Sequence, residues 1–63
     1  MKSHNWEKEA IAFVKAEGVI LSSELAEHLK ISWNTAEKYL LELALDEKVK
    51  RIKKKGANLW MLK

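Results

Sequence analysis

Residues 25–43, LAEHLKISWNTAEKYLLEL, decide the fold because they predict two helices joined by a tight turn. In the first helix, expected over residues 23–29, the apolar side chains share one side: Leu25, Ala26 and Leu29. Ser32 is the expected N-cap of the second helix, since its hydroxyl can accept a hydrogen bond from a free N–H group of the first turn. That helix is expected to continue for about four turns, to residue 48. Its buried face is expected to hold Ala36, Tyr39, Leu40 and Leu43.

Another helix is predicted ahead of this pair. Residues 3–17 place apolar side chains on one stripe at Trp6, Ala10, Phe13 and Val14. Ser3 or Asn5 can cap its start, and Gly18 stands where a left-handed residue ends many helices. Residues 19–21, VIL, are too short for a helix and predict a short strand or an extended connector. The two serines that follow can cap the next helix.

The C-terminal quarter predicts a β-hairpin. Residues 49–52, VKRI, and residues 58–62, NLWML, are short and rich in strand-forming residues. Between them lies Lys-Lys-Lys-Gly-Ala, in which Gly56 supplies the positive φ that a hairpin loop needs. Because an isolated hairpin is marginal in water, this one is expected to cover the helices.

Two tryptophans are expected to anchor the core. Trp60 and Leu62 share a strand face by their two-residue period, and Trp6 lies on the apolar stripe of its helix. The inward face of the preceding strand stays open, because Val49 and Ile52 cannot both point inward in a regular strand.

This order of elements, centred on residues 22–43, resembles the winged helix-turn-helix superfamily, and especially its small prokaryotic transcription regulators. The resemblance covers nearly the whole chain, with Ser32 matching the cap and Thr35-Ala36 matching the Thr-Val pair of the recognition helix. It implies a mainly α fold with a small β-hairpin: three helices, a short strand after the first, and a C-terminal two-stranded wing. We expect one domain over residues 1–63.

In DNA-binding members of this superfamily the recognition helix enters the major groove, while the wing approaches the backbone or minor groove. The resemblance implies a recognition helix at about residues 33–47 that presents to the groove Trp33, Asn34, Glu37 and Lys38. It makes Ser32 and Thr35 the phosphate contacts. The chemistry agrees for two of these residues: the Asn34 amide can pair with an adenine edge, and Lys38 can reach a guanine or a phosphate.

Charge is distributed unevenly along the chain. Residues 1–47 contain five lysines and nine acidic residues, whereas residues 48–63 contain seven Lys or Arg residues and no acidic residue, so their formal net charges are −4 and +7. Such asymmetry is typical of contact with nucleic acid or another anionic surface. The expected wing, residues 50–58, holds Arg51, Lys53, Lys54 and Lys55, with its three lysines at the tip.

Two other interpretations of this basic run stay open. A solvated face is the usual fate of a charge run, and lysines also protect an edge strand from aggregation. Lipid binding favours an amphipathic helix or a lipid anchor beside the charges, and neither is evident.

The recognition helix is itself acidic, because Lys38 is its one basic residue before Lys48, against Glu37, Glu42, Asp46 and Glu47. A carboxylate in the groove repels phosphate unless it accepts a hydrogen bond from cytosine. We therefore expect the wing to supply affinity more than the helix supplies base reading. Lys30 stands where the superfamily often has glycine, which predicts a somewhat altered turn.

An apolar patch suggests a second class of function. Leu41 and Leu45 lie one turn apart on the side opposite Leu43, and Trp33 can join them. Incidental exposure in a small chain is one explanation. The other is a homodimer or protein contact, which would make the chain a protein–protein interaction or dimerisation module of a larger complex.

Several function classes lack support in the sequence. There is no cysteine, and His4 and His28 have no partner at metal-ligand spacing. Phosphate-loop, nucleophile-elbow and zinc-protease motifs are absent, so we expect no enzyme, cofactor, metal or small-molecule substrate. No secretory segment and no apolar run long enough to span a bilayer is present. The expected protein is cytoplasmic, or nucleoid-associated, with double-stranded DNA as its partner and no membrane contact.

Overall fold

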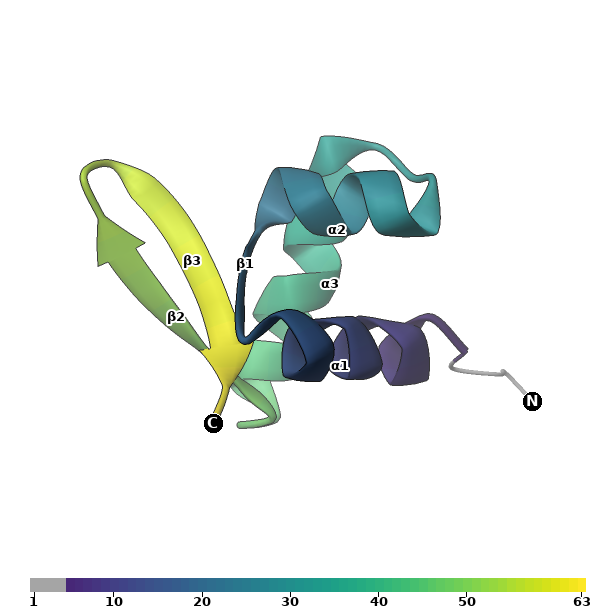
Figure 1. The fold of residues 1–63 in the computed structure, drawn as a ribbon, viewed down its shortest axis with the longest axis horizontal. Helices are drawn as coiled ribbons and strands as arrows, with labels where there is room; N and C mark the ends of the chain where they lie inside the picture. Colours follow the sequence, from purple (N-terminus) through teal and green to yellow (C-terminus); the bar gives the residue numbers. More distant parts are fainter. Residues whose placement is uncertain (1–4) are drawn as a thin grey trace.

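The computed structural model describes residues 5–63, which form three helices and one three-stranded sheet (Figure 1). The elements in chain order are α1 Asn5–Glu17, β1 Val19–Leu21, α2 Ser22–Leu29, α3 Trp33–Leu45, β2 Val49–Lys54 and β3 Ala57–Leu62. This is the winged helix-turn-helix fold, so the predicted fold class is confirmed. The expected caps of α1 are not tested, because Ser3 and the Asn5 side chain lie outside the described part.

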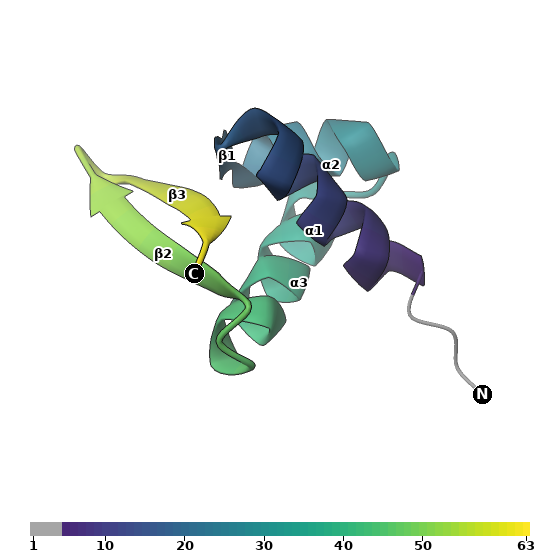
Figure 2. The same cartoon turned by 60° about the horizontal axis from the view of Figure 1, so that its bottom comes forward.

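The hairpin of β2 and β3 is the wing, and it projects beyond the three helices. Figure 1 shows it at the left, with α2 and, below it, α1 crossing in front of α3. In Figure 2 the hairpin again projects away from the helices, and its end near the C-terminus lies close to α3. The wing thus extends the sheet beyond the helical body.

One hydrophobic core joins all six elements of the described chain. Trp60 of β3 is its largest fully buried side chain, with 0% of its surface exposed. The buried apolar residues are Ala10, Val14, Ile20, Leu25, Ala26, Ala36, Leu40, Leu43, Val49 and Trp60. Trp6 is half-buried and stacks on Tyr39, with ring centroids 4.0 Å apart. Both tryptophans expected to anchor the core do pack there, Trp60 at its centre and Trp6 at its margin.

Ser22 is a buried polar residue within this core. Its side chain is 4% exposed, and its Oγ accepts a hydrogen bond of 3.0 Å from the indole Nε1 of Trp60. The expectation that this serine caps α2 is therefore wrong. Leu21 occupies the N-cap position, and its backbone N–H donates to Oε1 of Glu24 at 2.9 Å.

The sheet has the strand order β1-β3-β2, and both neighbouring pairs are antiparallel. In the register, Trp60 pairs with Ile20 on one side and with Arg51 on the other, while Val49 pairs with Leu62. Directly paired residues share a face, so these five side chains lie on the face turned toward the helices. We call this the inner face.

The opposite face of the sheet is called the outer face. It carries Val19, Leu21, Lys50, Ile52, Lys54, Ala57, Leu59 and Met61, by strict alternation with the inner face. Val49 is 2% exposed, whereas Ile52 is only half-buried. The prediction that Val49 and Ile52 do not both point inward is thus confirmed.

Left-handed residues set the turns between elements. Gly18 ends α1 at φ 88°, as expected, and its N–H donates to the Val14 carbonyl at 2.7 Å. Lys30 ends α2 at φ 58° and ψ 47°, the conformation that glycine adopts most easily. The prediction of an altered turn is therefore wrong, because Lys30 adopts the left-handed conformation that a glycine would have at this position. Glu47, at φ 63°, follows the end of α3, so this helix is shorter than predicted.

The wing turn is tighter than expected. Lys55 and Gly56 have φ values of 51° and 80°, and they alone separate the last residue of β2 from the first of β3. Two positive φ values in a two-residue loop are typical of a type I′ hairpin. Lys53 and Lys54 therefore belong to β2, and Lys55 is the lysine at the tip.

Candidate nucleic-acid interface

The N-terminus of α3 is fixed by a two-residue hydrogen-bond pair. The Ser32 Oγ accepts from the backbone N–H of Thr35 at 3.2 Å, which confirms Ser32 as the N-cap. The same oxygen donates its hydrogen to Oγ1 of Thr35 at 2.9 Å. The one hydrogen of the Ser32 hydroxyl is used by this arrangement and is not left for a phosphate. The Thr35 hydroxyl keeps its own hydrogen, which can be donated to an outside acceptor such as a phosphate oxygen.

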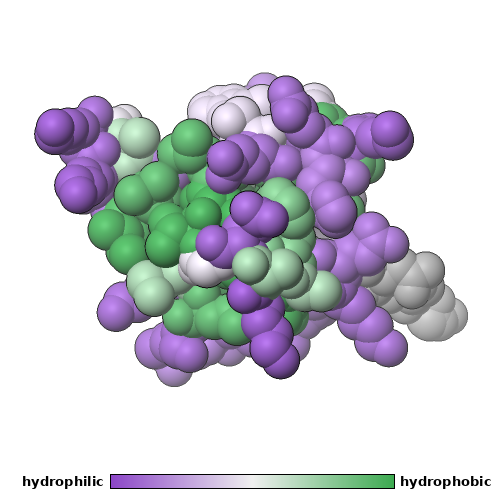
Figure 3. Space-filling model, viewed as in Figure 1, coloured by the Kyte–Doolittle hydropathy of each residue, from purple (hydrophilic) through white to green (hydrophobic). Residues whose placement is uncertain are grey.

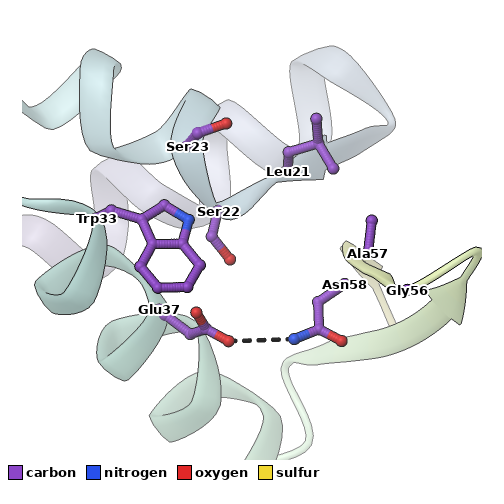
Figure 4. Close-up of a pocket in the computed structure, with 8 residues that line it drawn as sticks. All are labelled: Leu21, Ser22, Ser23, Trp33, Glu37, Gly56, Ala57 and Asn58. Atoms are coloured by element: carbon purple, nitrogen blue, oxygen red, sulfur yellow. Dashed lines mark hydrogen bonds between the residues drawn. The ribbon is translucent and has the colours of Figure 1, made fainter.

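The first two turns of α3 present side chains in two directions. Asn34 and Lys38, one turn apart, are exposed and lie on the solvent side. Trp33 is 54% exposed, while Glu37 is half-buried. Trp33 and Glu37 line the space between α3 and the wing, as Figure 4 shows. The structure therefore separates the four residues expected in the groove into an outward pair and a wing-side pair.

A hydrogen bond connects α3 to the wing. The amide Nδ2 of Asn58, on β3, donates to Oε2 of Glu37 at 3.1 Å (Figure 4). The other amide atom, Oδ1, is buried and has no hydrogen-bond partner among the described residues. One oxygen of the Glu37 carboxylate is thus held by the wing, which leaves Oε1 for any other donor.

Asn58 was not among the predicted site residues, although its position in the strand indicates that it points toward α3. It stands two residues before Trp60 and four before Leu62, so the same period that predicts their inward direction also turns Asn58 toward α3. A polar residue at an inward position near a hairpin tip indicates a polar partner on the facing helix.

A shallow pocket of about 240 Å³ lies between the N-termini of α2 and α3 and the wing tip. Figure 4 shows the Trp33 indole on one side of it and Asn58 on the other, with Ser22 and Ser23 above. Its lining residues are Leu21, Ser22, Ser23, Trp33, Glu37, Gly56, Ala57 and Asn58.

The basic residues of the wing occupy both of its faces. Arg51 and Lys53 lie on the inner face, where Lys53 pairs in register with Asn58. Lys54 lies on the outer face and Lys55 in the turn. All four side chains are exposed, and none forms an ion pair within residues 5–63. Cationic groups therefore surround the end of the wing and continue along its inner face toward α3.

The three apolar residues expected to form one patch, Trp33, Leu41 and Leu45, lie in two separate hollows in the structure. Leu41 is 41% exposed and Leu45 is 82% exposed, which agrees with the expectation that both face outward. With Ala44 and Arg51 they line an open groove of about 510 Å³ between α3 and β2. Trp33 instead lines the pocket at the other end of α3, together with Glu37.

The structure also shows the surroundings of the histidines and the length of the helices, which bear on metal binding and membrane spanning. His28 is exposed and stacks on Phe13 with ring centroids 4.3 Å apart, and His4 lies outside the described residues. No group of three or more potential metal ligands occurs within residues 5–63. Within the same residues, no helix has the length and apolar character needed to cross a bilayer.

Comparison with solved structures supports the fold assignment. A mutant of ZitR from Lactococcus lactis superposes with a TM-score of 0.80 at 26% sequence identity, over 100% of this chain and 44% of the ZitR chain. This chain therefore spans less than half of the length of ZitR. No protein-family model matches the sequence, and no curated protein matches it. Fold and site together define a winged helix-turn-helix protein with a basic wing.

Proposed function

We propose that this protein binds double-stranded DNA through α3 and the wing, and that it acts as a small transcriptional or chromatin-associated regulator. The observation that carries the proposal is a group of four exposed cations on the wing, which form no ion pair with residues 5–63: Arg51, Lys53, Lys54 and Lys55. Cations on a projecting hairpin can approach the phosphate backbone on both sides of a groove. The likeness to ZitR supports a fold suited to this role.

The N-terminus of α3 adds contacts that set orientation. The Thr35 hydroxyl and the N–H groups at the start of the helix can donate to a phosphate, and the helix dipole favours the negative charge there. Asn34 and Lys38 face outward on the same turns, where they can meet base edges. Ser32 acts through the conformation it gives to this end, since its hydroxyl is already occupied by Thr35.

The wing-side pair on α3 restricts base reading. Glu37 can accept from cytosine most freely with Oε1, because Oε2 already accepts a hydrogen bond from Asn58. Trp33 can stack on sugar or base at the mouth of the pocket. This division predicts affinity that depends strongly on salt and only modestly on sequence.

Titration of duplex DNA at two salt concentrations tests the proposal. If about four phosphates are neutralised, affinity falls roughly 100-fold between about 50 and about 200 mM salt. The Arg51→Gln/Lys53→Gln variant is expected to bind about tenfold more weakly at the lower salt and to show a smaller salt slope.

Lys8→Gln/Lys15→Gln removes the same charge from exposed positions on α1 and serves as the matched control. Equal weakening by both double variants would show a response to net charge alone and would contradict a wing interface. No binding of the natural protein at the lower salt would refute the proposal.

A second candidate function is a protein-interaction module, and the open groove beside Leu41 and Leu45 favours it. The Leu41→Lys/Leu45→Lys variant tests it by capture of protein partners from a lysate. If partners bind the natural chain and the double variant equally, the apolar groove has no role in recognition. Trp33 belongs to the separate pocket and is tested by Trp33→Ala.

A further inference from the structure

The outer face of the sheet is apolar where solvent should favour polar residues. Val19 is 44% exposed and Leu21 is 36% exposed, and beside them lie the half-buried Ile52, Leu59 and Met61. None of these five packs against the hydrophobic core. An antiparallel sheet with one solvated face normally alternates apolar inward and polar outward residues. Figure 3 shows the resulting apolar surface in the region of β1 and β3.

The apolar residues form two registered rows across the sheet. Val19 and Met61 are paired in one row, which Lys50 completes on β2. Leu21, Leu59 and Ile52 form the next row, with an apolar residue on every strand. The five residues are therefore one continuous patch, which we call the outer patch.

Charge of opposite sign borders the outer patch at its two edges. On the β2 side, Lys50 and Lys54 share the outer face with it. On the β1 side, Glu17 ends α1 just before the strand, and Glu24 is held at the other end of the strand by the N–H of Leu21. Between them β3 contains no charged residue. The sheet thus changes from acidic through apolar to basic in the direction across its strands.

We infer that the outer patch binds the outer patch of a second copy of this chain, in a two-fold dimer whose axis runs parallel to β3. Such an axis places β1 of each copy over β2 of the other, with the sheets stacked about 10 Å apart. Glu17, just before β1, then lies toward the Lys50 end of β2 in the second copy, and Glu24, just after β1, lies toward its Lys54 end. A two-fold axis across the strands would instead place like charges together, so charge complementarity selects the first arrangement.

The size of the patch sets the strength of this dimer. The hairpin strands are about 20 Å long, and three strands span about 14 Å, which is small beside a standard protein interface. We therefore expect association that depends on concentration in the range from micromolar to millimolar. The inference does not depend on DNA binding, since Arg51 and Lys53 lie on the opposite face of the wing; of the four wing cations, Lys54 is the one that lies on the outer face.

Sedimentation equilibrium of the natural chain, from about 10 µM to about 1 mM, tests the inference. The mean mass is expected to rise toward twice the 7.3 kDa of one chain. Val19→Lys inserts a charge into the outer patch at an exposed position, and this variant is expected to stay monomeric. Ala12→Lys, at an exposed position on α1, is the control and should leave dimerisation unchanged, while Leu45→Lys tests the competing groove beside α3. A natural chain that is monomeric at 1 mM (about the upper limit here), or a dimer lost only in Leu45→Lys, would overturn the inference.

Charge exchange tests the direction of the two-fold axis. Glu17→Lys and Lys50→Glu are each expected to weaken dimerisation about threefold to tenfold, because each places like charges together at two symmetric positions. The double variant Glu17→Lys/Lys50→Glu restores opposite pairs and should recover most of the loss. Glu9→Lys, elsewhere on α1, has the charge change of Glu17→Lys and serves as its control. Failure of the double variant to recover, with each variant shown to be folded by circular dichroism, rules out this axis.

Discussion

Asn58 on the wing donates a hydrogen bond of 3.1 Å to Glu37 on α3, across 21 positions of the sequence. This bond lies toward the projecting end of the hairpin, because Asn58 pairs with Lys53 just before the turn. Elsewhere the wing is anchored at its base, through the burial of Trp60 and Val49. The bond therefore fixes the angle between the wing and the recognition helix at a point where packing is sparse.

Asn58→Asp is expected to reverse this attraction. Two carboxylates at hydrogen-bond distance repel, which raises the pKa of one of them in the folded state and lowers the free energy of unfolding by about 1–3 kcal/mol near neutral pH. A raised folded-state pKa in an acid has its full cost in stability above that pKa and no cost below the unfolded-state pKa of about 4, so the loss should disappear as the pH falls below about 4.

Urea unfolding at about pH 7 and about pH 4 measures this difference. Asn34→Asp is the matched control, because it is exposed at the start of α3, where a negative charge favours the helix dipole. A loss in Asn58→Asp that is equal at both pH values would show that repulsion from Glu37 is not its cause.

The bond between Trp60 and Ser22 makes a second prediction. Ser22→Ala leaves the indole N–H of Trp60 buried without a partner, so we expect it to lower the free energy of unfolding by about 1–3 kcal/mol. Ser23→Ala, at the exposed neighbouring position, should change it by less than about 0.5 kcal/mol. Thermal or urea unfolding gives both values, and equal effects would argue against a role for the buried bond.

One substitution should have opposite effects at two lysines. Lys30→Gly relieves a left-handed conformation and is expected to stabilise the protein by about 1 kcal/mol. Lys38→Gly places glycine inside an exposed helix and should destabilise it by about 1 kcal/mol. Urea unfolding of the two variants checks the contrast. A loss of stability in Lys30→Gly would mean that the lysine side chain contributes more than its backbone strain costs.

Lys48 links the segment before β2 to α1 by an ion pair with Glu7. The hydrogen bond to Glu7 raises the pKa of Lys48 above its ordinary value of 10.5. A raised lysine pKa contributes stability at lower pH, and this contribution is lost as the pH rises through the folded-state value. Lys48→Met should therefore lower the melting temperature at about pH 8.

The difference between the natural chain and Lys48→Met should shrink at a pH above the raised folded-state pKa of Lys48, where both chains lack the charge. Melting curves at the two pH values measure it. A difference that persists unchanged at the higher pH would assign the effect to packing of the lysine side chain.

Much of the fold follows from local chemistry in the sequence. Ser32 and Gly18 fix helix ends by hydrogen bonds and φ values that depend on nearby residues alone, and both were predicted correctly. The period-2 pattern likewise places Trp60 inward. Lys30 was predicted less well, because a lysine can be forced into a left-handed turn when the packing of two helices requires it.

The rest depends on contacts between distant residues. The hydroxyl of Ser22 has two uses with similar energies, a helix cap or a buried partner for an indole, and only the position of Trp60 decides between them. The pairing of Glu37 with Asn58 follows from the angle of the wing. The outer patch follows from the register of β1 with β3, which no local pattern specifies.

The three tryptophans lie in three different environments, and this gives the protein its own set of optical probes. Trp60 is fully enclosed, Trp6 is half-buried against Tyr39, and Trp33 is 54% exposed beside the wing. Quenching by acrylamide should therefore affect Trp33 first. A ligand that enters between α3 and the wing would change its emission while that of Trp60 stays constant, so binding at this site can be followed without any label.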